Sequence, residues 1–337
     1  MIRVPIDDPS RVGEARRLVA ALARRTGFGE GDLGRVGIVS TELATNLARH
    51  ATADPELLAS AVDDGDVAAI DILAVDRGPG GERPHAWLTD GFTTAGSPGT
   101  GLGAVRRAAD AFEIQSAPGL GTVILARIAA SRPVRRDAER SPASPSVIVG
   151  AVSVPIPSEI ENGDGWATRR VGPATAIVVV DGLGHGSEAH RAAETAVALF
   201  CRSPLEDLVE CLRRMDDGLR PTRGAAAAVA LIDPAAGELR YAGIGNISGS
   251  IVGPDGSRSL VSHNGTLGQG DVRPREFRYP VAPGSIVVMH SDGVRTHWTL
   301  DRYPGITRRA PSLIAGVLYR DERRGRDDVT IVVGRVP

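Results

Sequence analysis

Lysine is missing from this sequence of 337 residues, in which all 39 basic residues are arginine. Mechanisms that need a lysine amine are therefore excluded, namely Schiff-base catalysis, the lysine-dependent phosphate loop and the strand lysine of eukaryotic-type protein kinases. Cysteine is also scarce, because Cys201 and Cys211 are the only two and match neither a C-x-x-C nor a zinc spacing. The sequence therefore indicates a reduced protein.

Aromatic residues are few, the net charge is small and no long apolar run is present. With 4% aromatics, aliphatic side chains must fill the core, and a formal net charge of -2 provides no broad cationic surface for nucleic acid or an anionic membrane. No stretch reaches the roughly 18 apolar residues of a membrane helix, and the first residues lack the apolar region of a signal peptide. We expect a cytoplasmic protein that binds neither nucleic acid nor a membrane.

The length of the chain and its local composition predict two domains. At about 100–200 residues per domain, the chain is long enough for two domains with separate cores. Residues 131–146 are rich in arginine, proline, serine and alanine and show no hydrophobic periodicity, which is typical of a linker. We therefore expect one domain at 1–130 and a second at 147–337.

The hydrophobic pattern differs between the two expected domains. The first has the pattern of an α/β sandwich, with helices expected at 10–27, 33–51 and 102–110 and strands at 3–6, 67–75, 112–115 and 122–128. The second is richer in strands, expected at 147–154, 174–180, 226–232, 239–242, 285–289 and 329–333, with helices at 187–200, 205–219 and 312–319. The expected fold class is α+β in two domains.

Three segments of the first domain carry residues suited to binding ATP. Glu42 and Asn46 are four apart on one helix and project together, Asp76 ends a strand, and the run Gly99-Thr100-Gly101-Leu102-Gly103 opens the next helix. A glycine loop at a helix N-terminus presents N–H groups to phosphates. An asparagine oxygen can hold Mg²⁺, and a glutamate can accept a proton from an attacking hydroxyl. Each feature alone also fits a turn or a solvated helix face, and only the ordered set favours an ATP site.

This set resembles the GHKL ATPase superfamily and, within it, the RsbT-like and anti-sigma-factor serine kinases. Residues 41–46 are similar to the family's N-box, 76–80 to its first glycine box and 99–103 to its second. The resemblance implies that Glu42 is the general base and that Asn46 binds Mg²⁺. It also implies that Asp76 hydrogen-bonds the adenine amino group with support from Thr122, and that Gly78 and Gly80 shape the pocket. The second glycine box, which would also bind ATP, comprises Gly99, Thr100, Gly101, Leu102 and Gly103.

The second domain repeatedly places aspartate beside glycine or a second aspartate near strand ends. The instances are Asp164-Gly165, Asp181-Gly182, Asp292-Gly293 and Asp327-Asp328. Carboxylates without supporting cysteines favour hard ions such as Mg²⁺ or Mn²⁺, and two such ions about 3.5–4 Å apart can activate water for attack on phosphorus. A single Asp-Gly more commonly marks a turn. The apolar run 176–180 that leads into 181–186 is harder to explain in that way.

The order of these segments resembles the metal-dependent protein phosphatases, in their SpoIIE and RsbX branch, from residue 147 onward. The resemblance implies a β-sandwich flanked by helices, with metal ligands at Asp164, Asp181, the Gly182 carbonyl, Asp292 and Asp327 and with Asp328 as a neighbour. His185 could protonate the leaving serine oxygen or make a structural or metal-water contact. In the wider family the histidine directly follows the first glycine, whereas Leu183 and Gly184 intervene here.

Together the two resemblances predict a bifunctional protein serine/threonine kinase and phosphatase of a partner-switching pathway. ATP and Mg²⁺ would serve the first domain, two Mn²⁺ or Mg²⁺ ions the second, and a STAS-domain antagonist or scaffold would be the substrate. Three alternatives stay open. The first domain could be an anti-sigma factor that binds a sigma factor, it could be a nucleotide-binding docking module, or the chain could be a generic ATPase with a structural β-domain.

Overall fold

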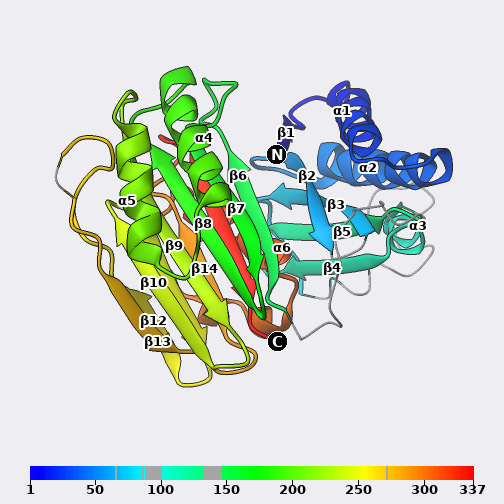
Figure 1. Ribbon diagram of the computed structural model, residues 1–337. Coiled ribbons are helices and arrows are strands. Elements are labelled where there is room, and N and C mark those ends of the chain that lie inside the picture. The colour runs from blue at the N-terminus through cyan, green and yellow to red at the C-terminus, as the bar shows by residue number, and fades with distance from the viewer. Residues whose placement is uncertain (65–66, 83, 85–86, 88–100, 132–145, 271) are drawn as a thin grey trace. The chain divides into compact units, whose positions relative to one another are not determined.

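The computed structural model describes residues 1–337 except 65–66, 83, 85–86, 88–100, 132–145 and 271. The chain divides into two compact units, residues 1–139 and 140–337, each with its own sheets and core (Figure 1). The expected α+β class in two domains is confirmed, and the finer boundaries at 130 and 147 stay a prediction. Among the described helices, none is both long and apolar enough to cross a membrane.

The first unit is an antiparallel sheet with helices packed on one face. Its strand order is β1-β2-β3-β5-β4. Val36, Val39 and Leu43 of α2 lie in the core between helices and sheet because their spacing puts them on one helix face. The elements are β1 (Ile2–Pro5), α1 (Arg11–Arg25), α2 (Glu30–His50), β2 (Glu56–Asp64), β3 (Val67–Asp76), α3 (Gly101–Ala108), β4 (Ala111–Ser116) and β5 (Thr122–Ala129).

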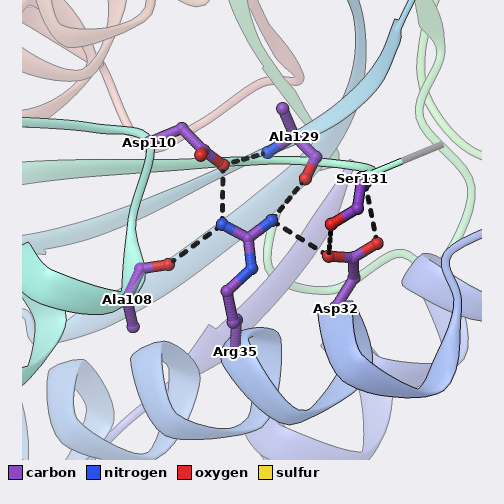
Figure 2. Close-up of polar contacts among 6 residues, drawn as sticks. All are labelled: Asp32, Arg35, Ala108, Asp110, Ala129 and Ser131. Atoms are coloured by element: carbon purple, nitrogen blue, oxygen red, sulfur yellow. Dashed lines mark hydrogen bonds and ion pairs between the residues drawn. The ribbon is translucent and has the colours of Figure 1, made fainter. Parts of the chain in front are cut away.

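A polar cluster ties α2 to the last residues described in this unit (Figure 2). Arg35 lies at its centre and donates to four acceptors, the carboxylates of Asp32 and Asp110 and the carbonyls of Ala108 and Ala129. Asp32 also accepts hydrogen bonds from the backbone N–H of Ser131 at 2.8 Å and from its hydroxyl at 2.6 Å. Burial opposes the charge of Asp32, but the hydrogen bonds from Ser131 and Arg35 outweigh it and lower the pKa of this carboxyl.

The second unit is a sandwich of two five-stranded sheets, in the orders β13-β10-β9-β8-β7 and β12-β11-β14-β15-β6. Helices α4 and α5 cover the outer face of the first sheet, and α6 packs on β6 and β15 of the second (Figure 1). The elements are β6 (Ile148–Val154), β7 (Asp164–Val171), β8 (Ala174–Gly182), α4 (Ser187–Arg202), α5 (Leu208–Leu219), β9 (Ala225–Asp233), β10 (Glu238–Ile244), β11 (Ser248–Gly253), β12 (Gly256–Leu260), β13 (Glu276–Pro280), β14 (Ile286–His290), α6 (Pro311–Glu322) and β15 (Val329–Arg335).

Strand β8 is apolar without alternation because both of its faces are buried. Val178 and Val180 pack in the core beneath α4 and α5, whereas Ile177 and Val179 pack in the core between the two sheets. The apolar run stops at Asp181, so the first acidic residue of the strand comes at its carboxyl end.

Five strands were not expected from the sequence, namely β2, β7, β11, β12 and β13. Strand β7 carries glycine, threonine and two arginines, and β12 carries glycine, arginine and two serines. These residues obscure the period-two apolar pattern by which strands are identified. These strands form through pairing with neighbours in the sheet, as β7 does with β8 along its full length.

Candidate functional sites

Three of the predicted ATP-site residues meet where α2 faces the start of α3. Glu42 and Asn46 are half-buried and lie one turn apart on α2. A Cβ on Gly101, the first residue of α3, would lie 3.0 Å from Oε2 of Glu42 and 3.5 Å from Oδ1 of Asn46. The missing side chain of Gly101 therefore lets both polar side chains approach the N-terminus of α3.

Asn46 has an unmet hydrogen-bonding group. Its Nδ2 atom is buried and finds no hydrogen-bond partner within the described ranges of the chain. Leaving a buried amide unpaired costs about 1–3 kcal/mol, which a bound polar ligand would recover. A carboxylate, an amide and a helix N-terminus side by side fit Mg²⁺ and the phosphates of ATP. The predicted phosphate-loop residues Gly99 and Thr100 lie outside the described residues.

The turn after β3 fixes Asp76, the residue predicted to bind adenine. Asp76 lies opposite Thr122 of β5 in the sheet, and its Oδ1 accepts a hydrogen bond of 2.7 Å from the backbone N–H of Gly78. The hydroxyl of Thr122 is 3.0 Å from that of Ser116, whose oxygen also accepts from the backbone N–H of Gly81. The β3–β5 pairing therefore places Asp76 next to Thr122, and these hydrogen bonds fix the turn and the hydroxyl around them.

Close backbone approach explains the glycines around this turn. Gly80 and Gly121 have positive φ angles, of 63° and 70°. A Cβ on Gly80 would lie 2.0 Å from the carbonyl oxygen of Ala117, and one on Gly121 would lie 2.2 Å from that of Asp76. The two glycines therefore allow the turn to close against β5. Two other predicted pocket residues have a packing role, since Leu102 contacts the hydrophobic core and Gly103 is buried in α3.

In the second unit, the predicted metal-site aspartates form one electrostatic cluster. The register of β7 and β8 puts Asp164 directly opposite Asp181. Burial, with the charges of Asp292 and Asp327, raises the pKa of Asp181 to about 7, and burial with the charge of Asp181 raises the pKa of Asp164 well above its usual value. Burial and Asp292 also raise the pKa of Asp327. The structure thus brings together four aspartates that are far apart in the sequence.

The chemistry of this cluster fits divalent cations. Buried like charges disfavour one another, and a cation among them relieves that repulsion. Oxygen donors without sulfur favour Mg²⁺ or Mn²⁺ over softer ions. Within the described part of the chain, no three His, Cys, Asp or Glu side chains form a closed ligand group. The aspartates therefore supply oxygen donors and negative charge rather than a prebuilt coordination shell.

Asp328 differs from the other aspartates because its carboxylate binds the backbone. Its Oδ1 accepts a hydrogen bond from the N–H of Ile156 at 2.7 Å, and its Oδ2 accepts one from Gly163 at 2.8 Å. Both ends of the loop 156–163 are thereby hydrogen-bonded to Asp328, the residue just before β15. We therefore interpret Asp328 as an anchor for this loop, and its predicted place beside the metal ligands stays a prediction. Its partners are backbone groups at least 165 residues earlier, which no motif reveals.

His185 lies beside the aspartate cluster and pairs with Glu159, which the sequence analysis did not identify. Nδ1 of His185 is 2.9 Å from Oε1 of Glu159, and the imidazole acts electrostatically on both Asp327 and Asp328. Gly186, with a φ of 76°, leaves room for the glutamate, since a Cβ there would lie 3.3 Å from the carboxyl group. Glu159 is 26 residues before His185, outside the motif that drew attention to the histidine.

Two polar residues that the sequence analysis also missed hold the aspartates in place. The Nδ2 of Asn246 donates to Oδ2 of Asp292 at 2.9 Å. The hydroxyl of Ser291 donates to Oδ2 of Asp164 at 2.6 Å and accepts from the N–H of Thr330. Gly182, whose carbonyl was predicted as a ligand, donates its N–H to the carbonyl of Gly163 at 3.0 Å.

Comparison with known proteins assigns each unit to a family. Residues 7–128 match the model of the histidine kinase-like ATPase domain, and residues 172–337 match that of stage II sporulation protein E (SpoIIE). The chain is 36% identical to the serine/threonine-protein kinase RsbT of Bacillus subtilis (strain 168) over 112 residues, which are 33% of this chain and 84% of RsbT. The chain belongs to the RsbT-like histidine kinase-like ATPase family and joins this domain to a SpoIIE-type phosphatase domain.

The second unit has similarities of its own. The chain is 24% identical to the phosphoserine phosphatase RsbX of Bacillus subtilis (strain 168) over 183 residues, covering 52% of this chain and 87% of RsbX. A solved structure of RsbX in complex with magnesium shares the fold, with a TM-score of 0.50 and 20% identity over 59% of this chain and 99% of that one. A structure from work on the bacterial stressosome has a TM-score of 0.53 and 29% identity, covering 56% of this chain and 100% of that one.

Proposed function

We propose that the chain both phosphorylates and dephosphorylates serine or threonine residues of partner proteins in a partner-switching pathway. The observation that carries the phosphatase half is the aspartate cluster, in which Asp164 is buried and the register of β7 and β8 sets it against Asp181. Asp181, Asp292 and Asp327 lie within residues 172–337, which match the SpoIIE model, and Asp164 precedes that match in the strand paired with β8.

In the phosphatase reaction, Asp164, Asp181, Asp292 and Asp327 with the Gly182 carbonyl would hold two Mg²⁺ or Mn²⁺ ions. When bound, such ions supply an activated water and stabilise negative charge on the phosphoryl group. The water oxygen forms a new bond to phosphorus while the bond from phosphorus to the serine or threonine oxygen breaks. His185 gives a proton to that leaving oxygen, and the proton released by the water restores the imidazolium.

In the kinase reaction, the hydroxyl oxygen of the substrate attacks the γ-phosphorus of ATP while Glu42 accepts the proton of that hydroxyl, and ADP leaves. Asn46 would hold Mg²⁺, and Asp76 with Thr122 would orient the adenine. The buried Nδ2 of Asn46 without a partner in the described residues and the similarity to the kinase RsbT support this half.

The partners that this proposal implies are STAS-domain antagonist or scaffold proteins, encountered in the cytoplasm. The similarities to RsbT and to a stressosome structure support partners of this class.

The decisive experiment follows phosphate on a STAS-domain protein by intact mass, in the presence of Mg-ATP and Mn²⁺. We expect the phosphorylated form to accumulate with Asp292→Asn and to stay low with the unaltered chain, whose phosphatase removes it. Adding Glu42→Ala to Asp292→Asn should abolish the accumulation. If Asp292→Asn never adds phosphate, the kinase half is wrong; if it removes phosphate from the phosphorylated partner as fast as the unaltered chain, the phosphatase half is wrong.

A further inference from the structure

We propose that Glu159 is a positioning residue that orients the imidazole of His185 toward the leaving oxygen of the substrate. The proposal rests on the phosphatase function described above and adds to it a residue that lies outside the aspartate cluster. Three observations support it: the contact of Glu159 with His185, the anchoring of the loop 156–163 that carries Glu159, and the exposure of the His185 imidazole.

The contact selects which imidazole nitrogen is available for proton donation. A glutamate oxygen only accepts hydrogen bonds when ionised, so the Nδ1 atom 2.9 Å from Oε1 is the nitrogen that donates to it. Nε2 is then the nitrogen that can give its proton to the leaving serine or threonine oxygen. A carboxylate on one imidazole nitrogen is a common way to fix the ring and the role of the other nitrogen.

The loop that carries Glu159 is itself fixed to the segment that carries the aspartates. The N–H of Glu159 donates to the carbonyl of Ile156 at 3.0 Å, which closes a turn. Asp328 holds the N–H groups of Ile156 and Gly163 on either side of that turn. Asp328, which follows Asp327 in the chain, therefore fixes both ends of the loop that carries Glu159, and the Glu159 carboxylate in turn contacts His185.

His185 needs such a partner because the rest of its side chain is open to solvent. The side chain of His185 is 59% exposed, against 32% for Glu159. An exposed imidazole without a partner samples several rotamers, so fixing one of them against a substrate costs side-chain conformational entropy. The Glu159 hydrogen bond reduces that loss before the substrate arrives.

The alternative is an ordinary surface ion pair, and the chain contains a matched example. His190 on α4 has its Nε2 3.3 Å from Oε1 of Glu194, whose side chain is 71% exposed. Exposed pairs of this kind contribute only about 0–1 kcal/mol to stability. If Glu159 belonged to that class, removing it would affect the reaction no more than Glu194→Ala does.

The test compares two substrates on the Mn²⁺-loaded full chain. A phosphoserine peptide has a poor leaving group that needs a proton, whereas p-nitrophenyl phosphate has a good one that does not. We expect Glu159→Ala to lower kcat on the peptide about tenfold, as part of the roughly 100-fold or larger contribution of a general acid, with kcat on the aryl phosphate changed by less than about twofold. Glu159→Gln, which keeps an oxygen acceptor, should restore part of the peptide activity, and Glu194→Ala should change neither substrate.

Two further readouts separate positioning from a general effect. Mn²⁺ affinity by calorimetry should be the same in Glu159→Ala as in the unaltered chain, and adding Glu159→Ala to His185→Gln should cause no further loss on the peptide. Equal slowing of both substrates, an additive double variant or altered Mn²⁺ affinity would overturn the proposal; Glu159→Gln provides the same comparison if the alanine variant does not fold. An unaltered chain that hydrolyses neither substrate would instead refute the phosphatase function itself.

Discussion

The two candidate sites differ in what each lacks. In the first unit, the buried Nδ2 of Asn46 finds no partner within the described residues, beside a glycine that leaves space at a helix N-terminus. In the second unit, Asp164 and Asp181 have hydrogen-bonded or charged neighbours, but those charges are of one sign. Burial and these neighbouring carboxylates raise the pKa of both aspartates. A polar ligand would complete the first site and cations the second. An unpaired donor and mutually repelling carboxylates would therefore favour different ligands, which are a nucleotide and metal ions in the function proposed above.

The largest expected effect tests the second half of this comparison. Asp181→Asn removes a charge from the centre of the cluster and should lower phosphate release from a phosphoserine peptide by more than about 100-fold, since even indirect partners of a metal account for about 10–100-fold. The matched control is Asp255→Asn, an exposed aspartate in the turn between β11 and β12. Equal activity of the two variants would show that the cluster is structural.

The next effect tests the first site. Glu42→Ala should lower transfer of phosphate from ATP to a protein partner by about 100-fold or more, the usual contribution of a general base. ATP affinity by calorimetry should stay the same, because the glutamate acts on the substrate hydroxyl. Glu30→Ala, an exposed change at the start of the same helix, is the control. Unchanged transfer would favour the docking-module alternative.

A smaller effect measures the space that Gly101 leaves. Gly101→Ala should weaken ATP binding about tenfold, equivalent to about 1.4 kcal/mol, because the new Cβ would lie 3.0 Å from Oε2 of Glu42. Gly34→Ala, on α2 where a Cβ meets no atom within 4 Å, should leave binding unchanged. Equal ATP affinity of the two variants would show that Gly101 does not lie in the ATP-binding pocket.

The smallest effect lies away from both sites, in the cluster of Figure 2. Asp32→Asn should lower the free energy of unfolding of the first unit by about 1–2 kcal/mol at neutral pH, because the hydrogen bonds from Arg35 and Ser131 to a charged acceptor are lost or weakened. The folded pKa of Asp32 is below 3.8, so its contribution is complete above pH 3.8 and is lost as the pH falls through the folded value. Denaturant titrations at pH 7 and pH 3 should therefore show a smaller difference between variant and unaltered chain at pH 3, whereas equal differences would contradict the assignment.

The sequence predicted the elements whose apolar pattern is local. Strand β8 carries a continuous apolar run and helix α2 carries apolar residues at helical spacing, and both lie within a few residues of their expected ranges. Strands β7 and β12 were missed because arginine and glycine in both, with serine in β12, mask their pattern, and only pairing with a neighbour identifies them. Local periodicity therefore predicts the strands with buried faces better than the strands that depend on their partners.

The same limit applies to the sites. Asp164 and Asp181 could be identified because aspartate beside glycine is recognisable in a sequence, whereas Glu159, Asn246 and Ser291 act through contacts with residues 26, 46 and 127 positions away. The hydrogen bonds that Asp328 accepts could not be predicted for a related reason, since its partners are backbone N–H groups, which every residue type except proline offers. Residues that hold other residues in place are visible only in the fold.

The pairing of β7 with β8 has a consequence for how this protein can change over evolution. Successive residues of a strand point to opposite faces, so inserting or deleting one residue in either strand would turn Asp164 and Asp181 away from each other even if the sandwich still formed. Exchange of one aliphatic residue for another along β8 would leave the pair intact. A relative that has lost catalysis but kept the fold is therefore expected to show a change of strand length here as readily as a change of aspartate.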